Sequence, residues 1–366
     1  MPSLRRRSPR SSRNTHADFT MSKFADLKMT AKPFPGTRIT FPVGRTSDGG
    51  MIVGDFGETP NILVGGCTGS GKTNFLHSMI RSLIERHSPD ELRIVLEDTK
   101  GTEFRDYDQV PHLFCPIIRE PDRLGRVLAA LERETELRLE TFSAAGCRDI
   151  AAWNAANRKT RMPFVVVISD EVSDDMALFP GTVGPFAVRL ATQRGVAGIH
   201  LVLSSSRFGS GDVFADAMLA AFGGRMAFHA DSVDDLTRFL SEYRAEPSVP
   251  GRGVWKDSSG ELTSVQTPIV RENDIQRTIS ETIRRYHRRH FAVGCACRAR
   301  FGTPEELFRQ ASKTVLETGQ ATACSLQRRL GIGDEEARRA MSLLEERGVV
   351  GPASGNGPRK ILVAPR

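Results

Sequence analysis

The sequence predicts an α/β protein with a mostly parallel β-sheet, followed by a second, smaller domain. Three observations predict this division. Short, almost continuous apolar runs alternate with amphipathic stretches from about residue 39 to residue 272, as in sheets that helices cover on both faces. A glycine-rich loop at 66–73 stands between an apolar run and an amphipathic stretch. After Pro304 the apolar spacing changes to that of three short helices and a β-ribbon.

The expected strands and helices of the larger domain alternate along the chain. The strands are short apolar or alternating runs at 38–42, 51–55, 61–64, 92–97, 164–169, 200–204, 225–229, 253–255 and 262–266. The helices have apolar residues three and four positions apart and lie at 72–86, 121–143, 185–194, 212–222 and 233–241. Strands that alternate with helices in this way favour parallel pairing.

Length and composition describe a globular protein with one large core and room for a second, small one. The chain has 366 residues, 39% of them hydrophobic, and a formal net charge of +7 from 51 Lys and Arg against 44 Asp and Glu. This excess favours an anionic partner, either nucleic acid or a membrane surface. No apolar run approaches the ~20 residues that span a bilayer, so no membrane span is expected.

Six cysteines without a signal peptide indicate reduced thiols and a cytoplasmic protein. Cys295 and Cys297 form the one close pair, and their spacing fits no common zinc pattern. Residues 1–38 are rich in Arg, Ser and Pro and are expected to be a disordered basic tail and lead-in, with Met21 as a second candidate start. The basic stretch at 273–303 is expected to be a linker.

The loop Gly66-Cys67-Thr68-Gly69-Ser70-Gly71-Lys72-Thr73 has the spacing of a nucleotide-phosphate cradle. Its backbone N–H groups point at the β-phosphate, and only glycine lets the backbone come so close. Lys72 can reach the β- and γ-phosphates, and the Thr73 hydroxyl is placed to bind Mg²⁺. The domain at 39–272 is therefore expected to be a RecA-like P-loop NTPase that binds ATP and Mg²⁺.

The strand at 164–169 ends in Asp170 and Glu171, which is the pattern of a Walker B strand. Asp170 is expected to hold Mg²⁺ through water beside Thr73, and Glu171 to polarise the water that attacks the γ-phosphate. Asp98 and Lys100 follow the strand at 92–97. They reach the same edge of the sheet, where side chains usually serve the site.

The strand at 200–204 leads to Ser205, Ser206 and Arg207 at the same edge. Either serine is a candidate sensor of the γ-phosphate, and Arg207 is a candidate for stabilising the charge that develops in phosphoryl transfer. Arg194 precedes this strand and is a candidate arginine finger that acts across a subunit interface, with a plain surface arginine as the alternative. His200 is expected to be a hydrogen-bonded core residue.

Residues 304–366 have the pattern of a winged helix-turn-helix. The last helix presents Arg338 and Arg339 on the face opposite its apolar core residues. Together with Arg359 and Lys360 of the expected β-ribbon, they are the candidate DNA-binding residues.

These motifs resemble those of the FtsK/SpoIIIE family of DNA-pumping ATPases over about residues 39 to 366. The matching segments are the P-loop, the Asp98–Lys100 strand end, 110–113, the Asp170-Glu171 pair, 197–203, 325–333 and 345–350. The resemblance implies an ATP-hydrolysing double-stranded DNA translocase that forms a hexameric ring and carries a γ domain that reads short DNA sequences. It implies a role in chromosome segregation or, as in TraB-type conjugation motors, in plasmid or mobile-element transfer.

Three departures from the family pattern bear on function. The membrane-spanning N-terminal part of the cell-division members is not in this sequence, so we expect no anchor of its own and leave a membrane-anchoring partner open. Residues 205–208 read Ser-Ser-Arg-Phe where members usually carry Thr-Gln-Arg-Pro, which puts γ-phosphate sensing in question. Glu335 and Glu336 stand where members carry a polar and a basic residue, so a different DNA target is expected.

Two other classes of protein stay open. Type VII protein-secretion ATPases share the P-loop fold, although they repeat the ATPase domain instead of carrying a winged helix. A DNA-binding regulator with a vestigial ATPase is disfavoured by Lys72, Thr73, Asp170 and Glu171, which are intact. ATP hydrolysis stimulated by duplex DNA, by a secreted peptide or by neither separates the three.

Overall fold

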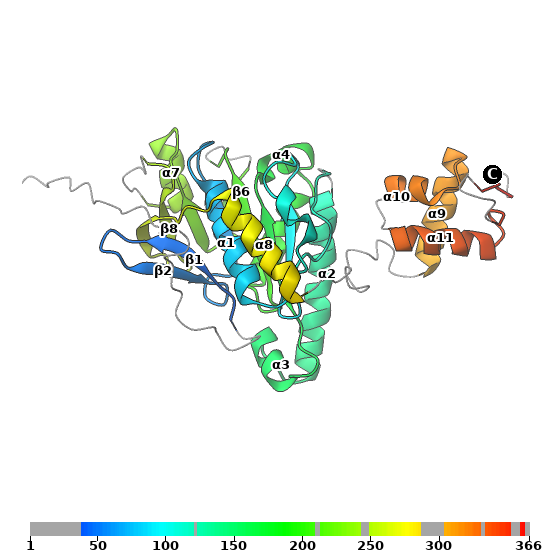
Figure 1. Ribbon diagram of the computed structural model, residues 1–366, viewed down its shortest axis with the longest axis horizontal. Helices are drawn as coiled ribbons and strands as arrows, with labels where there is room; N and C mark the ends of the chain where they lie inside the picture. Colours follow the sequence, from blue (N-terminus) through cyan, green and yellow to red (C-terminus); the bar gives the residue numbers. More distant parts are fainter. Residues whose placement is uncertain are drawn as a thin grey trace, which may run out of the picture.

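The computed structural model describes residues 38–120, 123–208, 213–242, 249–286, 304–330, 334–352 and 359–362. The expected basic tail, the Cys295–Cys297 pair and residues 287–303 lie outside these ranges. Within them the chain forms two units, each with a hydrophobic core of its own (Figure 1). No helix in the described ranges is both long enough and apolar enough to cross a membrane.

One sheet of nine strands runs through the first unit. In chain order its strands are β1 (Thr40–Arg45), β2 (Met51–Asp55), β3 (Ile62–Gly65), β4 (Leu92–Glu97), β5 (Phe164–Ser169), β6 (Ile199–Ser205), β7 (Gly224–Ala227), β8 (Arg252–Lys256) and β9 (Leu262–Gln266). In space the order is β2-β1-β9-β8-β7-β3-β6-β5-β4. The strands from β7 to β4 pair in parallel, and the others extend the sheet with antiparallel pairs. The predicted α/β class is confirmed, with the parallel part around β3.

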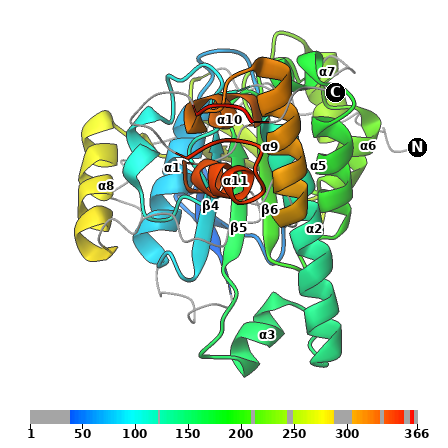
Figure 2. The ribbon, with the colours of Figure 1, turned by 90° about the vertical axis from the view of Figure 1, so that its right-hand side faces the viewer.

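Helices cover both faces of the sheet. α1 (Lys72–Arg86) and α8 (Glu272–Tyr286) lie on one side of β4, β5 and β6, and α5 (Val183–Thr192) and α6 (Asp216–Ala221) lie on the other (Figure 2). The second side also carries α2 (Arg123–Ala144), α4 (Val172–Leu178) and α7 (Val233–Leu240). Neighbouring residues of β3 alternate between the two cores, because Ile62 and Val64 face one and Leu63 faces the other.

The remaining elements of this unit are the helix α3 (Ile150–Ala156) and the 3₁₀-helix η2 (Arg105–Gln109). Neither these nor α4 were among the expected helices. Each has only five to seven residues, too few to show a helical period in the sequence.

Residues 273–286, expected to be part of a linker, instead form most of α8. Ile275 and Ile279, one turn apart, are buried in the core beside α1. Thr278 Oγ1 accepts a hydrogen bond from Arg81 Nε at 3.0 Å and donates one to Glu85 Oε1 at 2.6 Å. The first unit therefore extends at least to the end of α8.

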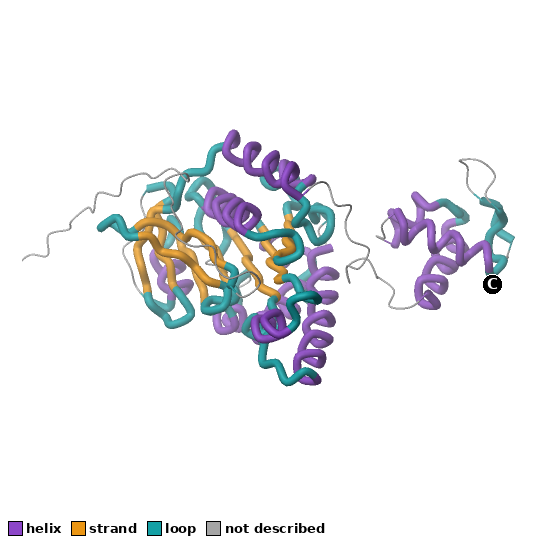
Figure 3. The backbone as a smooth tube through the Cα atoms, turned by 60° about the horizontal axis from the view of Figure 1, so that its bottom comes forward, coloured by secondary structure: helices purple, strands orange, loops and turns teal. Residues whose placement is uncertain are grey.

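The second unit consists of α9 (Pro304–Thr318), α10 (Ala323–Leu330) and α11 (Asp334–Glu346). Antiparallel bridges join Ala321 to Arg359 and Val350 to Ile361. Figure 3 shows the helices and the short extended segments that follow them. Three helices with a minimal β-ribbon are the winged helix-turn-helix that the sequence predicted, while the expected turn at 331–333 lies outside the described residues.

Candidate nucleotide-binding and hydrolysis site

The P-loop connects β3 to α1 at the carboxyl-end edge of the parallel strands. Its backbone is held from both sides: Cys67 N–H donates to the His229 carbonyl at 2.8 Å, and Gly251 N–H donates to the Ser70 carbonyl at 2.8 Å. Gly71 has a φ of 117°, and a Cβ at this position would lie 2.8 Å from both Cα and N of Gly251. Two backbones approach so closely here that only glycine fits.

The Lys72 ammonium lies inside the loop. Its Nζ donates to the carbonyl oxygens of Gly66 at 2.7 Å and Cys67 at 3.1 Å, and the side chain is buried. Burial lowers the pKa of Lys72, and the charges of Glu171 and Asp170 act in the opposite direction. A buried ammonium beside a turn of backbone amides is suited to binding phosphate oxygens.

Thr73 and Asp170 meet although their strands are not neighbours, since β6 lies between β3 and β5. Thr73 Oγ1 donates to Asp170 Oδ1 at 3.0 Å. Burial raises the pKa of Asp170 to about 6, and the hydrogen bond from Thr73 partly opposes this. A hydroxyl and a carboxylate oxygen are ligands that Mg²⁺ accepts, and a bound cation favours the charged carboxylate. These residues therefore fit the expected metal site.

Glu171 is held by the end of β6 and the start of α4. The Ser206 backbone N–H donates to both carboxylate oxygens, at 2.9 and 3.1 Å, and Ser173 Oγ donates to Oε1. Burial would raise the pKa of Glu171, but these hydrogen bonds outweigh it and hold the pKa below its usual value. The carboxylate thus remains charged and able to accept a proton at neutral pH.

Ser206 therefore contacts Glu171 through its backbone N–H, whereas the sequence predicted only that Ser205 or Ser206 senses the γ-phosphate. Ser205 Oγ accepts from the Arg207 backbone N–H at 3.0 Å. The Arg207 guanidinium donates to Asp174 Oδ1 at 2.6 Å, near the start of α4. Arg207 is thus tied to the helix that follows the acid pair.

In the segment after β4, the carboxylate of Asp98 holds the following loop in place. Asp98 is buried, and its carboxylate accepts from the backbone N–H groups of Gly101, Glu103 and Phe104 at 2.8 to 2.9 Å. It therefore folds the loop that carries Lys100, which is exposed and whose charge lowers the pKa of Lys72 after larger contributions. Sequence reasoning gave no part to Glu103, whose charge helps to raise the pKa of Asp170.

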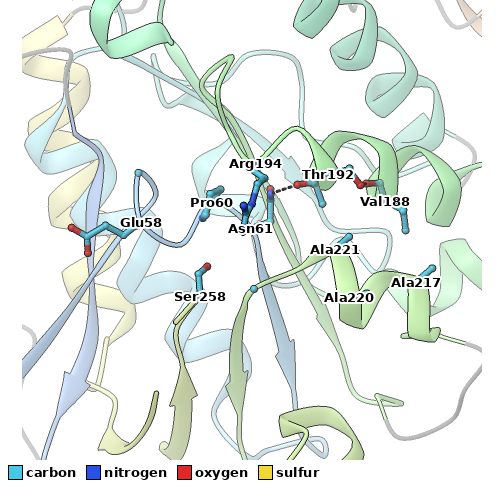
Figure 4. A pocket seen from close by; sticks show the side chains of 13 residues that line it. Glu58, Pro60, Asn61, Val188, Thr192, Arg194, Ala217, Ala220, Ala221 and Ser258 are labelled. Carbon is cyan, nitrogen blue, oxygen red and sulfur yellow. Dashed lines mark hydrogen bonds between the residues drawn. The ribbon is translucent and has the colours of Figure 1, made fainter. Parts of the chain in front are cut away.

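Arg194 lies at the opposite edge of the sheet. It follows α5 in a left-handed backbone conformation with φ 51° and lines a groove of about 650 Å³ together with Asn61, Thr192 and Ser258 (Figure 4). Asn61 directly precedes β3, whereas the P-loop directly follows it. A four-residue strand spans about 13 Å at ~3.3 Å per residue. Arg194 is therefore out of reach of the P-loop in its own copy.

Several titratable side chains are buried away from the P-loop. Burial lowers the pKa of four histidines to about 4: the half-buried His77 and the buried His87, His112 and His200. As expected for a core residue, the His200 ring contacts the Pro60 carbonyl, with Nδ1 at 3.0 Å from the oxygen. Burial raises the pKa of Glu97, whose Oε2 accepts from Ser169 Oγ at 2.5 Å.

The candidate DNA-binding residues lie on the second unit. Arg338 and Arg339 are exposed on α11, between the buried residues Ala337 and Ala340. Lys360 is also exposed, whereas Arg359 pairs with Glu345 and joins the β-ribbon to α11. The side chains of Glu335 and Glu336 are outside the described part of the structure.

Two family models match this chain. The model of the FtsK/SpoIIIE family matches residues 25–210, and that of the FtsK gamma domain matches residues 303–364. The first range includes the P-loop and the acid pair, and the second includes α9 to α11.

Curated proteins named DNA translocase FtsK are similar over most of this chain. The protein of Leptospira interrogans (strain Fiocruz L1-130) is 33% identical over 358 residues, covering 90% of this chain and 36% of that protein. The protein of Oceanobacillus iheyensis is 30% identical, covering 89% of this chain and 44% of that protein. The chain thus spans less than half the length of these relatives.

Solved structures share the fold at lower identity. The pCW3 conjugation coupling protein TcpA, in a monomer form with ATPγS, is 20% identical with a TM-score of 0.62, covering 72% of this chain and 75% of that one. The cytoplasmic domain of the Thermomonospora curvata type VII secretion ATPase EccC is 22% identical with a TM-score of 0.60, covering 69% and 32%. Similarity at this level supports the P-loop ATPase fold and does not separate DNA transfer from secretion.

Proposed function

Because this chain belongs to the FtsK/SpoIIIE family, we propose that it hydrolyses ATP to move double-stranded DNA. The observation that carries the proposal is the contact between Thr73 and Asp170 at 3.0 Å, beside the buried Lys72 ammonium. This contact joins the phosphate cradle to the acid pair at one edge of the sheet. The match to the FtsK gamma domain supports DNA, rather than a secreted protein, as the substrate.

The residues of the P-loop and the acid pair have different roles in ATP hydrolysis. The P-loop backbone from Gly66 to Thr73 cradles the phosphates, and Lys72 places its charge on the β- and γ-phosphate oxygens. Thr73 and Asp170 would hold Mg²⁺, which when bound would neutralise charge that develops on the phosphates. Glu171 orients the attacking water and accepts its proton, held in place by Ser173 and Ser206.

We assign Arg194 to the nucleotide site of a neighbouring copy of the chain. Its distance from its own P-loop supports a role only across a subunit interface, where an arginine can stabilise the charge of the transferring phosphoryl group. A homo-oligomeric ring, which the family resemblance puts at six copies, supplies such interfaces. Arg207, paired with Asp174, is the candidate within the same copy.

The winged helix supplies the side chains that contact the bases or phosphates of DNA. Arg338 and Arg339 lie exposed on α11, the helix that enters the major groove in this class of domain, and Lys360 lies exposed on the ribbon. We assign base or phosphate contacts to these residues and a structural role to Arg359.

The motor works in the cytoplasm, where ATP and DNA meet.

The experiment is ATP hydrolysis by the full chain with and without duplex DNA, combined with displacement of a third strand from a triplex. Duplex DNA should stimulate hydrolysis, and ATP should drive displacement. Lys72→Ala should abolish both, since the ammonium is the main side-chain charge on the phosphates. Stimulation by a secreted peptide alone would favour a secretion ATPase, and tight DNA binding without turnover would favour a regulator.

A further inference from the structure

A group of basic side chains lies at the far end of α2, remote from the P-loop. We call residues 145–161 the basic tip. They include α3 and the turn before β5, so they lie at the amino-end edge of the parallel strands. Figures 1 and 2 both show α3 and the adjoining end of α2 projecting beyond the strands.

The basic tip carries a strong excess of positive charge. It has four basic residues, Arg148, Arg158, Lys159 and Arg161, against the single acid Asp149. The Arg148 side chain is 88% exposed and pairs with Asp149. Arg158 and Lys159 are exposed, and within the described ranges they form no hydrogen bond or ion pair with the rest of the chain. The two charges of Arg158 and Lys159 thus face solvent without a protein carboxylate to neutralise them, while Arg161 is half-buried.

The turn that presents these charges is held firmly. The Asn154 side chain bonds Met162 twice, donating to its carbonyl at 2.9 Å and accepting from its N–H at 2.8 Å. Thr160 N–H donates to the Asn157 carbonyl at 3.1 Å, which closes the turn around Arg158 and Lys159. The cations therefore lie on an ordered turn and lose little backbone entropy when they bind a partner.

The partner that fits is a row of phosphates. The aromatic residue of the basic tip, Trp153, packs against Phe142 and is not presented for stacking on bases. Exposed Arg and Lys on a short turn, rather than on a helix or ribbon that enters a groove, give a contact that depends on charge and not on sequence. We propose that the basic tip binds the phosphate backbone of duplex DNA, separately from the winged helix. This inference rests on the proposed DNA-moving function.

The test is the salt dependence of duplex DNA binding by the full chain. Arg158→Ala/Lys159→Ala removes two expected phosphate contacts, so the slope of log K against log salt should become shallower by about 1.8. If the plots of log K against log salt for the native chain and the variant meet at 1 M salt, their affinities differ roughly 60-fold at 0.1 M salt. The matched control is Arg133→Ala/Arg271→Ala, which also removes two exposed arginines. Arg133 lies on α2 away from the basic tip, and Arg271 directly precedes α8. DNA-independent ATP hydrolysis and the melting temperature should stay unchanged in both variants.

The outcomes separate this inference from the proposed function. If the native chain binds duplex DNA with a steep salt slope and the tip variant keeps that slope, the basic tip does not contact DNA and the inference is wrong. The same holds if tip and control variants lose affinity equally, or if the tip variant loses affinity only because it melts early. A native chain that fails to bind DNA at all contradicts the proposed function instead.

Discussion

Glu171→Gln tests the assignment of the proton acceptor. The amide keeps the size of the side chain and one acceptor oxygen, which can still take the hydrogen bonds from Ser173 and Ser206. It loses the charge and the second contact to the Ser206 N–H, at 2.9 Å in the native chain. Weakening these contacts costs about 1–2 kcal/mol of stability. Losing a general base costs about 10²- to 10⁴-fold in rate, or about 3–5 kcal/mol in the barrier. Turnover should therefore fall far more than stability.

The assay is steady-state ATP hydrolysis at saturating ATP and duplex DNA, with nucleotide affinity measured by fluorescence titration. Glu171→Gln should bind ATP with near-native affinity and hydrolyse it at least a hundredfold more slowly. The control is Glu136→Gln, the same change at an exposed site on α2, which should behave as the native chain. Hydrolysis within tenfold of native by Glu171→Gln, with Asp170→Asn inactive, would refute the division of roles.

Three further predictions follow from the geometry. Gly71→Ala should abolish nucleotide binding, because its Cβ meets backbone atoms at 2.8 Å, whereas at Gly69 a Cβ meets nothing within 4 Å and the same change should cost only about 1–3 kcal/mol of strain; equal loss of binding in both would contradict this. Stability should fall as pH falls from about 6 to 5. In the unfolded chain the four histidines bind protons in this range, whereas in the folded chain their pKa of about 4 keeps them neutral. Glu97 and Asp170, whose pKa values are raised in the folded chain, act oppositely. Four protons less two leave a net uptake of two on unfolding, or about 3 kcal/mol per pH unit, and a flat urea-unfolding profile would argue against it. Arg194→Ala should be inactive alone but recover partial ATPase activity when mixed with Lys72→Ala, since one interface then holds both native residues; no recovery would remove Arg194 from the site.

The phosphate cradle and the family were predictable from local sequence. The spacing of Gly66, Gly71 and Lys72 is a property of a single loop, and the apolar run before Asp170 identifies a buried strand by itself. Because parallel strands end at one edge, the meeting of Thr73 and Asp170 follows from the pattern. The family suggested by these motifs is confirmed by the match over residues 25–210.

The contacts that shape the site were not predictable, because they join segments far apart in the chain. The bond from Ser206 N–H to Glu171 spans 35 residues and depends on β6 lying next to β5. His229 reaches the P-loop only because β7 pairs with β3. Asp98 looked like a site residue from its place at a strand end, but its carboxylate is used by the loop that follows. Strand order in space, which local patterns do not encode, decides all three.

The packing of α8 on α1 has a mechanical consequence. α1 starts at the P-loop, and the Asn74 side chain in its first turn bonds the Pro268 carbonyl at 2.6 Å and the Val270 N–H at 2.9 Å, just before α8. α1 is about 22 Å long at ~1.5 Å per residue, and α8 packs along it. Because these hydrogen bonds and the packing of Ile275 and Ile279 hold α8 against α1, a shift of α1 would carry α8 with it. The winged helix follows α8 in the sequence, so the helix whose position is tied to the P-loop is also the last described element of the first unit.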